Sequence, residues 1–231
     1  MSRVSPPFVF ISGGCRSGKS AYAQSLAERC AERGQALFLA TAHPRDEETR
    51  RRIADHRRAR GPCWKTREPF PGKEGDLWRD LPVLARGMGA VLLDSLTLWL
   101  SAALENLREA EAGNIAPCAG QPPAEMSWCR EGQSCNAGGI GAGGPCPPSG
   151  DRLKAQALES CGHLLRALSV LPCPVVLVSD EVGLGLTPAD PAGRLFRDAL
   201  GLANQQAARL ATQAVFVVSG LPLLLKGESL P

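Results

Sequence analysis

Residues 7–24, PFVFISGGCRSGKSAYAQ, decide the fold of this chain. The apolar run from Phe8 to Ile11 has the β-branched and aromatic character of a buried strand. It leads directly into Gly13, Gly18, Lys19 and Ser20, which have phosphate-loop spacing. Glycines let backbone N–H groups approach phosphate oxygens, lysine reaches the β and γ phosphates, and a serine hydroxyl can bind Mg²⁺. The pattern predicts phosphate binding by the whole loop, Gly13, Gly14, Cys15, Arg16, Ser17, Gly18, Lys19 and Ser20. For Arg16 and Ser17 the alternative is simple exposure to solvent. For the whole segment the alternative is a glycine-rich turn that links a strand to a helix.

Short β-rich runs alternate with helical segments along the rest of the chain. This rhythm predicts a mostly parallel sheet flanked by helices, in a single α/β domain (residues 1–231) of the RecA-like, phosphate-loop NTPase type. The expected strands are 8–12, 36–41, a weaker 63–66, 90–94, 174–179 and 214–219. The expected helices are 21–33, 46–60, 96–110, 152–170 and 194–212, which carry apolar residues at spacings of three and four.

Residues 111–150 interrupt the alternation. They are crowded with glycine, proline and cysteine and have few aliphatic residues, so we interpret them as a loosely ordered insertion. The four cysteines of this segment, 118, 129, 135 and 146, are too widely spaced for the usual zinc patterns. A flexible loop is the favoured interpretation.

The net charge and the composition argue against several classes of protein. The net charge of +3 is too small to indicate a nucleic-acid partner. No apolar run approaches the length of a membrane span, and nothing at the N-terminus resembles a signal peptide, so we expect a cytoplasmic protein. Nine cysteines without close pairs favour reduced thiols over a disulfide framework.

Two of the expected strands end in acids, at Asp94 and at Asp180–Glu181. Ligands gather at the carboxyl ends of parallel strands, and carboxylates there can hold Mg²⁺ or its water shell beside a nucleotide. For Asp94 the alternative is a helix N-cap, because a helical segment follows it. The glycines after Asp180 favour a loop, and such loops often carry function.

His56 lies on an expected helix among seven arginines between positions 45 and 60. Neighbouring cations keep an imidazole neutral, and the neutral form is the nucleophile that can attack phosphorus. By spacing alone, however, a histidine among arginines is more often a residue on a solvated helix face.

The order of these motifs resembles the family of bifunctional adenosylcobinamide kinases and adenosylcobinamide-phosphate guanylyltransferases of cobalamin biosynthesis. The matching segments are GGCRSGKS, FLATA, IADHR, WKTRE, LLDSLTLWLS, VLVSDEVGLGLTP, GRLFRDALGLANQQAA and VVSGLPL. They cover nearly all of the chain except residues 111–150. The histidine helix and the DEVG loop make the match far more specific than a phosphate loop alone.

The resemblance implies roles for individual residues. His56 matches the histidine that becomes guanylylated, and Lys19 belongs to the catalytic phosphate loop. Ser20 and Asp94 are the candidate Mg²⁺ ligands, and Glu181 lies in the EVG motif, where a structural role through backbone hydrogen bonds is also open. Beyond the loop, the implied nucleotide contacts are Ala40, Thr41, Ala42, Arg57, Arg58, Ala59, Arg60, Glu68 and Asp94.

The resemblance also implies the chemistry. ATP or GTP would phosphorylate adenosylcobinamide, and GMP would then pass from GTP through His56 to adenosylcobinamide phosphate. The implied cofactor is Mg²⁺ with the nucleotide, without a tightly bound organic cofactor, and the implied assembly is a small homo-oligomer. Two other interpretations stay open: a kinase of another small molecule with a single activity, and a GTP-binding switch that changes no metabolite.

Overall fold

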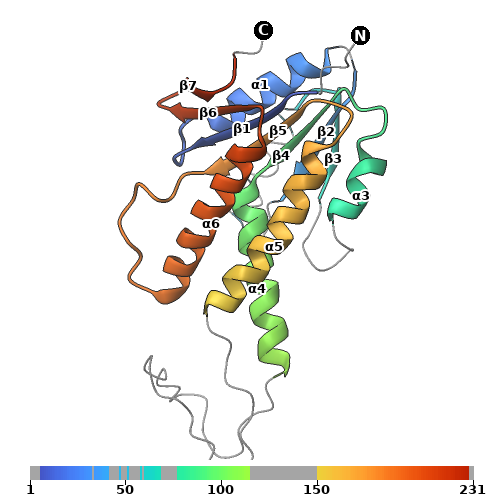
Figure 1. Ribbon diagram of the computed structural model, residues 1–231. Coiled ribbons are helices and arrows are strands. Elements are labelled where there is room, and N and C mark those ends of the chain that lie inside the picture. Colours follow the sequence, from blue (N-terminus) through green and yellow to red (C-terminus); the bar gives the residue numbers. More distant parts are fainter. Residues whose placement is uncertain are drawn as a thin grey trace, which may run out of the picture.

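A seven-stranded sheet forms the centre of the computed structural model (Figure 1), which describes residues 6–32, 34–41, 47, 51, 58, 60–68, 77–114 and 150–228. The strands are β1 (Phe8–Gly13), β2 (Ala36–Ala40), β3 (Trp64–Arg67), β4 (Ala90–Asp94), β5 (Val175–Asp180), β6 (Gln213–Val218) and β7 (Leu221–Lys226). Their order is β3-β2-β4-β5-β1-β6-β7, and every pair is parallel except β6 with β7. The predicted fold class is confirmed, and β1 lies between β5 and β6.

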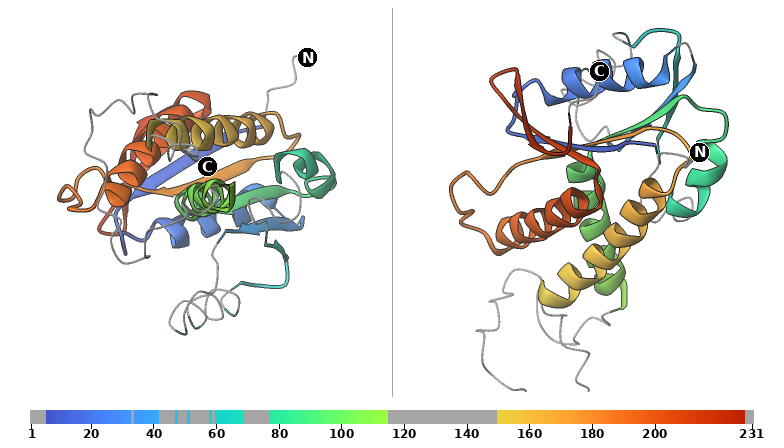
Figure 2. Two further views of the ribbon diagram at one scale, coloured as in Figure 1. Left: turned by 90° about the horizontal axis from the view of Figure 1, so that it is seen from below. Right: turned by 45° about the horizontal axis from the view of Figure 1, so that its top comes forward.

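Helices cover both faces of this sheet. They are α1 (Lys19–Ala31), α3 (Leu77–Leu84), α4 (Leu96–Asn114), α5 (Gly150–Ser169) and α6 (Pro191–Leu210). The right-hand view of Figure 2 shows α1 on one side of the sheet and α4, α5 and α6 on the other.

Side-chain alternation along the strands explains the two layers. Phe8 and Phe10 of β1 belong to the core beneath α4, α5 and α6, whereas Val9 and Ile11 belong to the core beneath α1. All six residues of β1 are buried. A strand buried on both faces appears in a sequence as an unbroken apolar run, which is why this strand was predictable.

Several expected boundaries were wrong. Helix α4 continues to Asn114, so residues 111–114, which we expected to open the insertion, are helical. Helix α5 begins at Gly150, the last residue of the expected insertion. Residues 115–149 and most of the expected helix 46–60 lie outside the described residues, although 47, 51 and 58 are helical.

Two elements were not predicted at all. Helix α3 is short and contains Pro82; its Leu81 is buried in the core, and its Leu84 packs against the same core. Strand β7 is an exposed edge strand with Pro222, a residue that edge strands tolerate because one side of their backbone needs no partner. None of the described helices is long and apolar enough to cross a bilayer.

Candidate active site at the phosphate loop

The loop between β1 and α1 has the compact backbone that phosphate binding requires. Gly13 has no room for a side chain, because a Cβ atom there would lie 2.6 Å from the carbonyl oxygen of Val217. Gly18 has φ +92°, in the left-handed region that favours glycine. The N–H of Gly220 donates to the carbonyl oxygen of Ser17 at 2.8 Å, so the turn after β6 supports the loop from outside.

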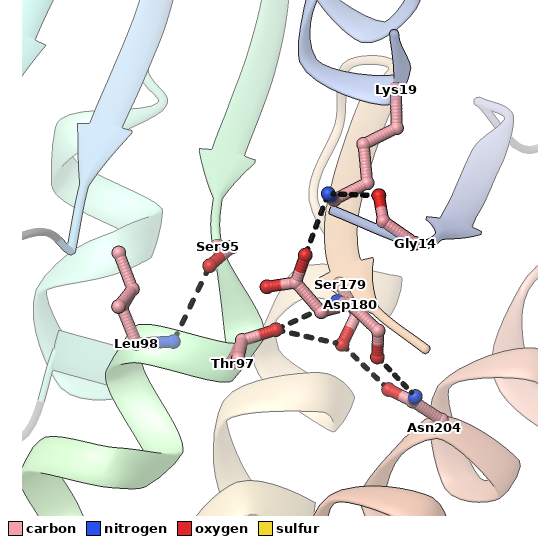
Figure 3. A network of polar contacts seen from close by, with 8 residues as sticks. All are labelled: Gly14, Lys19, Ser95, Thr97, Leu98, Ser179, Asp180 and Asn204. Carbon is pink, nitrogen blue, oxygen red and sulfur yellow. Dashed lines mark hydrogen bonds and ion pairs between the residues drawn. The ribbon is translucent and has the colours of Figure 1, made fainter. Parts of the chain in front are cut away.

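Lys19 is the first residue of α1, and its ammonium group already has anionic and polar partners. Its Nζ atom lies 2.6 Å from Oδ1 of Asp180 and donates to the carbonyl oxygen of Gly14 at 3.1 Å (Figure 3). The lysine side chain is 11% exposed and the aspartate side chain 29%. The pair is possible because the strand register sets Asp180, at the end of β5, directly beside Gly13.

A buried polar cluster holds the backbone of Asp180 from behind. Thr97 Oγ1 accepts a hydrogen bond from the Asp180 N–H at 2.7 Å, and Asn204 Nδ2 donates to the Asp180 carbonyl oxygen at 3.0 Å. Ser179 Oγ donates to Asn204 Oδ1 at 2.6 Å and lies 3.4 Å from Thr97 Oγ1. These three residues, Thr97, Ser179 and Asn204, are called the Asp180 support cluster below; all three are buried.

Sequence reasoning missed this support cluster. Its members come from α4, β5 and α6, and their proximity depends on tertiary pairing. One signal was available: Asn204 is a polar residue on a helix face whose neighbours Leu200, Ala203 and Ala207 are buried core residues. A polar side chain on an apolar stripe indicates a buried hydrogen-bond partner.

Asp94 ends β4, one strand beyond β5 from the phosphate loop. Ser95 caps the helix that follows, since Ser95 Oγ accepts from the N–H of Leu98 at 3.3 Å. Thr41 fixes this turn: its hydroxyl donates to the Ser95 carbonyl oxygen and accepts from the Ser95 N–H, both at 2.7 Å. Ser95 therefore contributes a cap to this helix, and the Thr41 hydroxyl is engaged with the protein itself.

Glu181 has the structural contact that we considered for it. Its Oε1 accepts a hydrogen bond from the N–H of Gly183 at 2.6 Å, and its own N–H donates to the Gly13 carbonyl oxygen at 3.0 Å. The residue therefore ties the loop after β5 to the start of the phosphate loop.

Arg60 and Glu68 line an open cavity of about 510 Å³ beside β3, together with Gly61, Trp64, Thr66 and Arg67. The Arg60 guanidinium lies 3.7 Å from the centre of the Phe38 ring and donates to Thr66 Oγ1 at 3.0 Å. A cavity with two arginines, an indole and a carboxylate has the chemistry to hold a polar aromatic ligand that carries phosphate.

The remaining predicted site residues have different placements. In the loop, Cys15 and Arg16 are exposed, and Gly14 and Ser20 are half-buried. Ser17 is buried, and its hydroxyl has no hydrogen-bond partner among the described residues. Ala40 is buried at the end of β2, and Arg58 is exposed. Outside the described residues lie His56, Ala42, Arg57 and Ala59.

The donor atoms present fit Mg²⁺ carried by a nucleotide. Ser20 offers a hydroxyl and Asp94 a carboxylate, and both supply the oxygen ligands that this ion prefers. Magnesium commonly takes one or two protein ligands and completes its shell with water and phosphate. Among the described residues there is no cluster of three or more histidine, cysteine or acidic side chains.

This combination of fold and loop defines a nucleotide-binding α/β protein of the phosphate-loop class. The family model described as cobinamide kinase / cobinamide phosphate guanyltransferase matches residues 9–225, and the chain belongs to this family.

Curated relatives match the chain over nearly their full length. It is 33% identical to the bifunctional adenosylcobalamin biosynthesis protein CobP of Pseudomonas aeruginosa, over 95% of this chain and 98% of the relative. It is 29% identical to the bifunctional adenosylcobalamin biosynthesis protein CobU of Escherichia coli, over 94% of this chain and 99% of the relative.

Solved structures with a similar arrangement are more distant. An ATPase domain of known structure has a TM-score of 0.40 at 12% identity, over 91% of this chain and 68% of that one. The P4 protein of bacteriophage phi6, in complex with ADP, has a TM-score of 0.34 at 14% identity, over 94% of this chain and 54% of that one.

Proposed function

We propose that this protein is a bifunctional enzyme that phosphorylates adenosylcobinamide and then transfers GMP from GTP to the resulting phosphate, giving adenosylcobinamide-GDP. The observation that carries the proposal is the joint presence of the family match over residues 9–225 and the Lys19 phosphate loop. Family membership over almost the whole chain favours this interpretation over a kinase with a single activity or a GTP switch.

In the kinase half, the residues of the loop would bind and orient the nucleotide. Backbone N–H groups of the loop and the start of α1 would offer hydrogen bonds and a positive helix end to the phosphates. Lys19 would stabilise the charge that spreads over the transferred phosphoryl group, which is the main task in this class of reaction. Bound Mg²⁺ would supply further neutralisation of phosphate charge, with Ser20 and Asp94 as its protein ligands.

In the guanylyl half, we propose His56 as the nucleophile. Its attack on the α-phosphorus of GTP forms an N–P bond and expels pyrophosphate, and the phosphate of the acceptor then displaces the histidine. A covalent intermediate divides a transfer between two anions into two easier steps. Arg57, Arg58 and Arg60 follow His56 directly in the sequence and would offset the repulsion between those anions.

We further propose that the enzyme works in the cytoplasm as a small homo-oligomer. The support is the family resemblance.

One experiment tests the function and separates the two halves. The purified protein is incubated with Mg²⁺ and GTP labelled on the α-phosphate, and its intact mass is measured after denaturation. We expect an acid-labile, base-stable adduct with the mass of GMP in the wild-type protein and no adduct in His56→Ala. With ATP and cobinamide, His56→Ala should still form the phosphorylated product, whereas Lys19→Ala should not. Absence of any adduct under conditions where GTP binds contradicts the guanylyl half.

A further inference from the structure

The ion pair between Lys19 and Asp180 occupies the position in which a phosphate-loop lysine meets its nucleotide. In such loops the lysine ammonium binds oxygens of the β and γ phosphates. Here one of its partners is Oδ1 of Asp180, at 2.6 Å. A nucleotide that binds here would compete with this carboxylate oxygen for the ammonium group, and the carboxylate would then lie close to the phosphates.

The surroundings of Asp180 fix its backbone and leave its side chain accessible. The support cluster binds the backbone on both sides, through the N–H to Thr97 and the carbonyl oxygen to Asn204. The side chain remains 29% exposed, and its partner among the described residues is Lys19. Figure 3 shows the carboxylate pointing from the end of β5 toward Lys19, away from Asn204. Buried polar groups cost free energy of folding unless all their hydrogen bonds are made. Three such residues that hold the backbone of one aspartate indicate that the position of Asp180 is important for function.

The neighbouring acids are less suited to act on the acceptor. Glu181 is held by the N–H of Gly183. Asp94 is paired in register with Val178, two residues before Asp180 along β5, and is the candidate Mg²⁺ ligand.

We propose that Asp180 is the catalytic base of the kinase step, a proposal that rests on the proposed function. The acceptor hydroxyl oxygen forms a bond to the γ-phosphorus, and the bond from that phosphorus to the bridging oxygen breaks with its electron pair on the departing nucleoside diphosphate. The hydroxyl proton passes to the Asp180 carboxylate, which Lys19 has released to the phosphates. Thr97, Ser179 and Asn204 are positioning residues that act through the Asp180 backbone.

The test compares Asp180→Asn and Asp180→Ala with the wild-type protein, with cobinamide as acceptor and ATP as donor. Nucleotide affinity is measured separately with a fluorescent ATP analogue in the absence of acceptor. A general base contributes about 10²- to 10⁴-fold, so we expect kcat to fall by that factor in both variants. The dissociation constant for nucleotide should stay equal or become lower, because the carboxylate that competes for Lys19 is gone.

Formate provides a readout that a structural role would not move. It should restore the activity of Asp180→Ala by about tenfold or more, since a small carboxylate can enter the space and accept the proton, and should leave Asp180→Asn unchanged because the amide fills that space. Asp151→Asn is the matched control, because Asp151 also pairs with a lysine, Lys154, at 2.9 Å, but its side chain is 85% exposed near the start of α5. It should retain wild-type kinetics.

Each other outcome overturns the proposal. Wild-type kcat in Asp180→Asn excludes a base at this position, and a defect that higher Mg²⁺ concentrations restore makes Asp180 a metal ligand. Weaker nucleotide binding without formate rescue reduces it to a structural partner of Lys19. Failure of the proposed function is distinguishable, because the wild-type protein itself would then not phosphorylate cobinamide.

Discussion

Replacing Asn204 by alanine should destabilise the protein through the Asp180 support cluster. The substitution removes two hydrogen bonds, to Ser179 Oγ at 2.6 Å and to the Asp180 carbonyl oxygen at 3.0 Å. Ser179 is fully buried, and among the described residues its hydroxyl then keeps the longer 3.4 Å contact to Thr97 alone. A buried polar group that loses its partner costs about 1–3 kcal/mol, so two affected groups give an expected loss of about 2–6 kcal/mol.

Urea denaturation followed by circular dichroism measures this loss as a lower midpoint at an unchanged slope. Gln205→Ala is the control, because Gln205 is the exposed neighbour on the same helix, and its free energy of unfolding should change by less than about 0.5 kcal/mol. Ser179→Ala in both backgrounds completes a double-mutant cycle, with an expected coupling of about 0.5–3 kcal/mol. A loss below about 1 kcal/mol for Asn204→Ala, or additive effects of the two substitutions, would refute the reasoning.

Three further outcomes follow from other contacts. Gly13→Ala should weaken nucleotide binding by about tenfold or more in a titration, since its Cβ would lie 2.6 Å from the Val217 carbonyl oxygen and displace the loop. Gly201→Ala is the control and should bind nucleotide normally, because a Cβ there meets nothing within 4 Å. Alkylation of the exposed Cys15, mapped by peptide mass, should block nucleotide binding and be slowed by nucleotide. Burial raises the pKa of the Cys161 thiol to about 12. Above about pH 8.5 the unfolded state therefore loses a proton that the folded state keeps. The thiol contributes its full stabilisation below that pH, and the contribution declines as the pH rises above it. Cys161→Ala should therefore show a shallower fall in the free energy of unfolding between about pH 9 and 10.5 than the wild-type protein, and equal slopes would contradict this.

Most of the sheet was predictable because its central parallel strands are apolar runs in the sequence, whereas the outer strand β3 is mostly exposed and gave only a weak pattern. Strands buried on both faces give continuous apolar runs, and glycines or acids mark their ends. The expected six strands all overlap observed ones. Strand β7 and helix α3 escaped notice because each contains a proline: Pro82 argues against the interior of a helix, and Pro222 argues against a strand within a sheet.

The site was predictable only as far as its motif is contiguous. The phosphate loop is eight consecutive residues, and its backbone is compact as expected. The partner of Lys19 could not be predicted in this way. Asp94 and Asp180 both end strands, and the sequence offers no means of deciding which acid lies beside Gly13. That choice depends on the strand order, which pairs β1 with β5 and sets β4 one strand further away.

The C-terminal hairpin gives the phosphate loop a support that its own sequence lacks. Gly220, at the turn between β6 and β7, donates to Ser17 of the loop, and a Cβ on Gly18 would lie 3.3 Å from the Gly220 Cα. The two backbones therefore meet at a pair of glycines, each with a positive φ. A loop rich in glycine is flexible when isolated, and binding a nucleotide would then cost the entropy of ordering it. By pairing with β6, strand β7 fixes the position of Gly220 and lowers that entropy cost. The VVSGLPL segment therefore supports the phosphate loop directly, although the two are about 200 residues apart in the sequence.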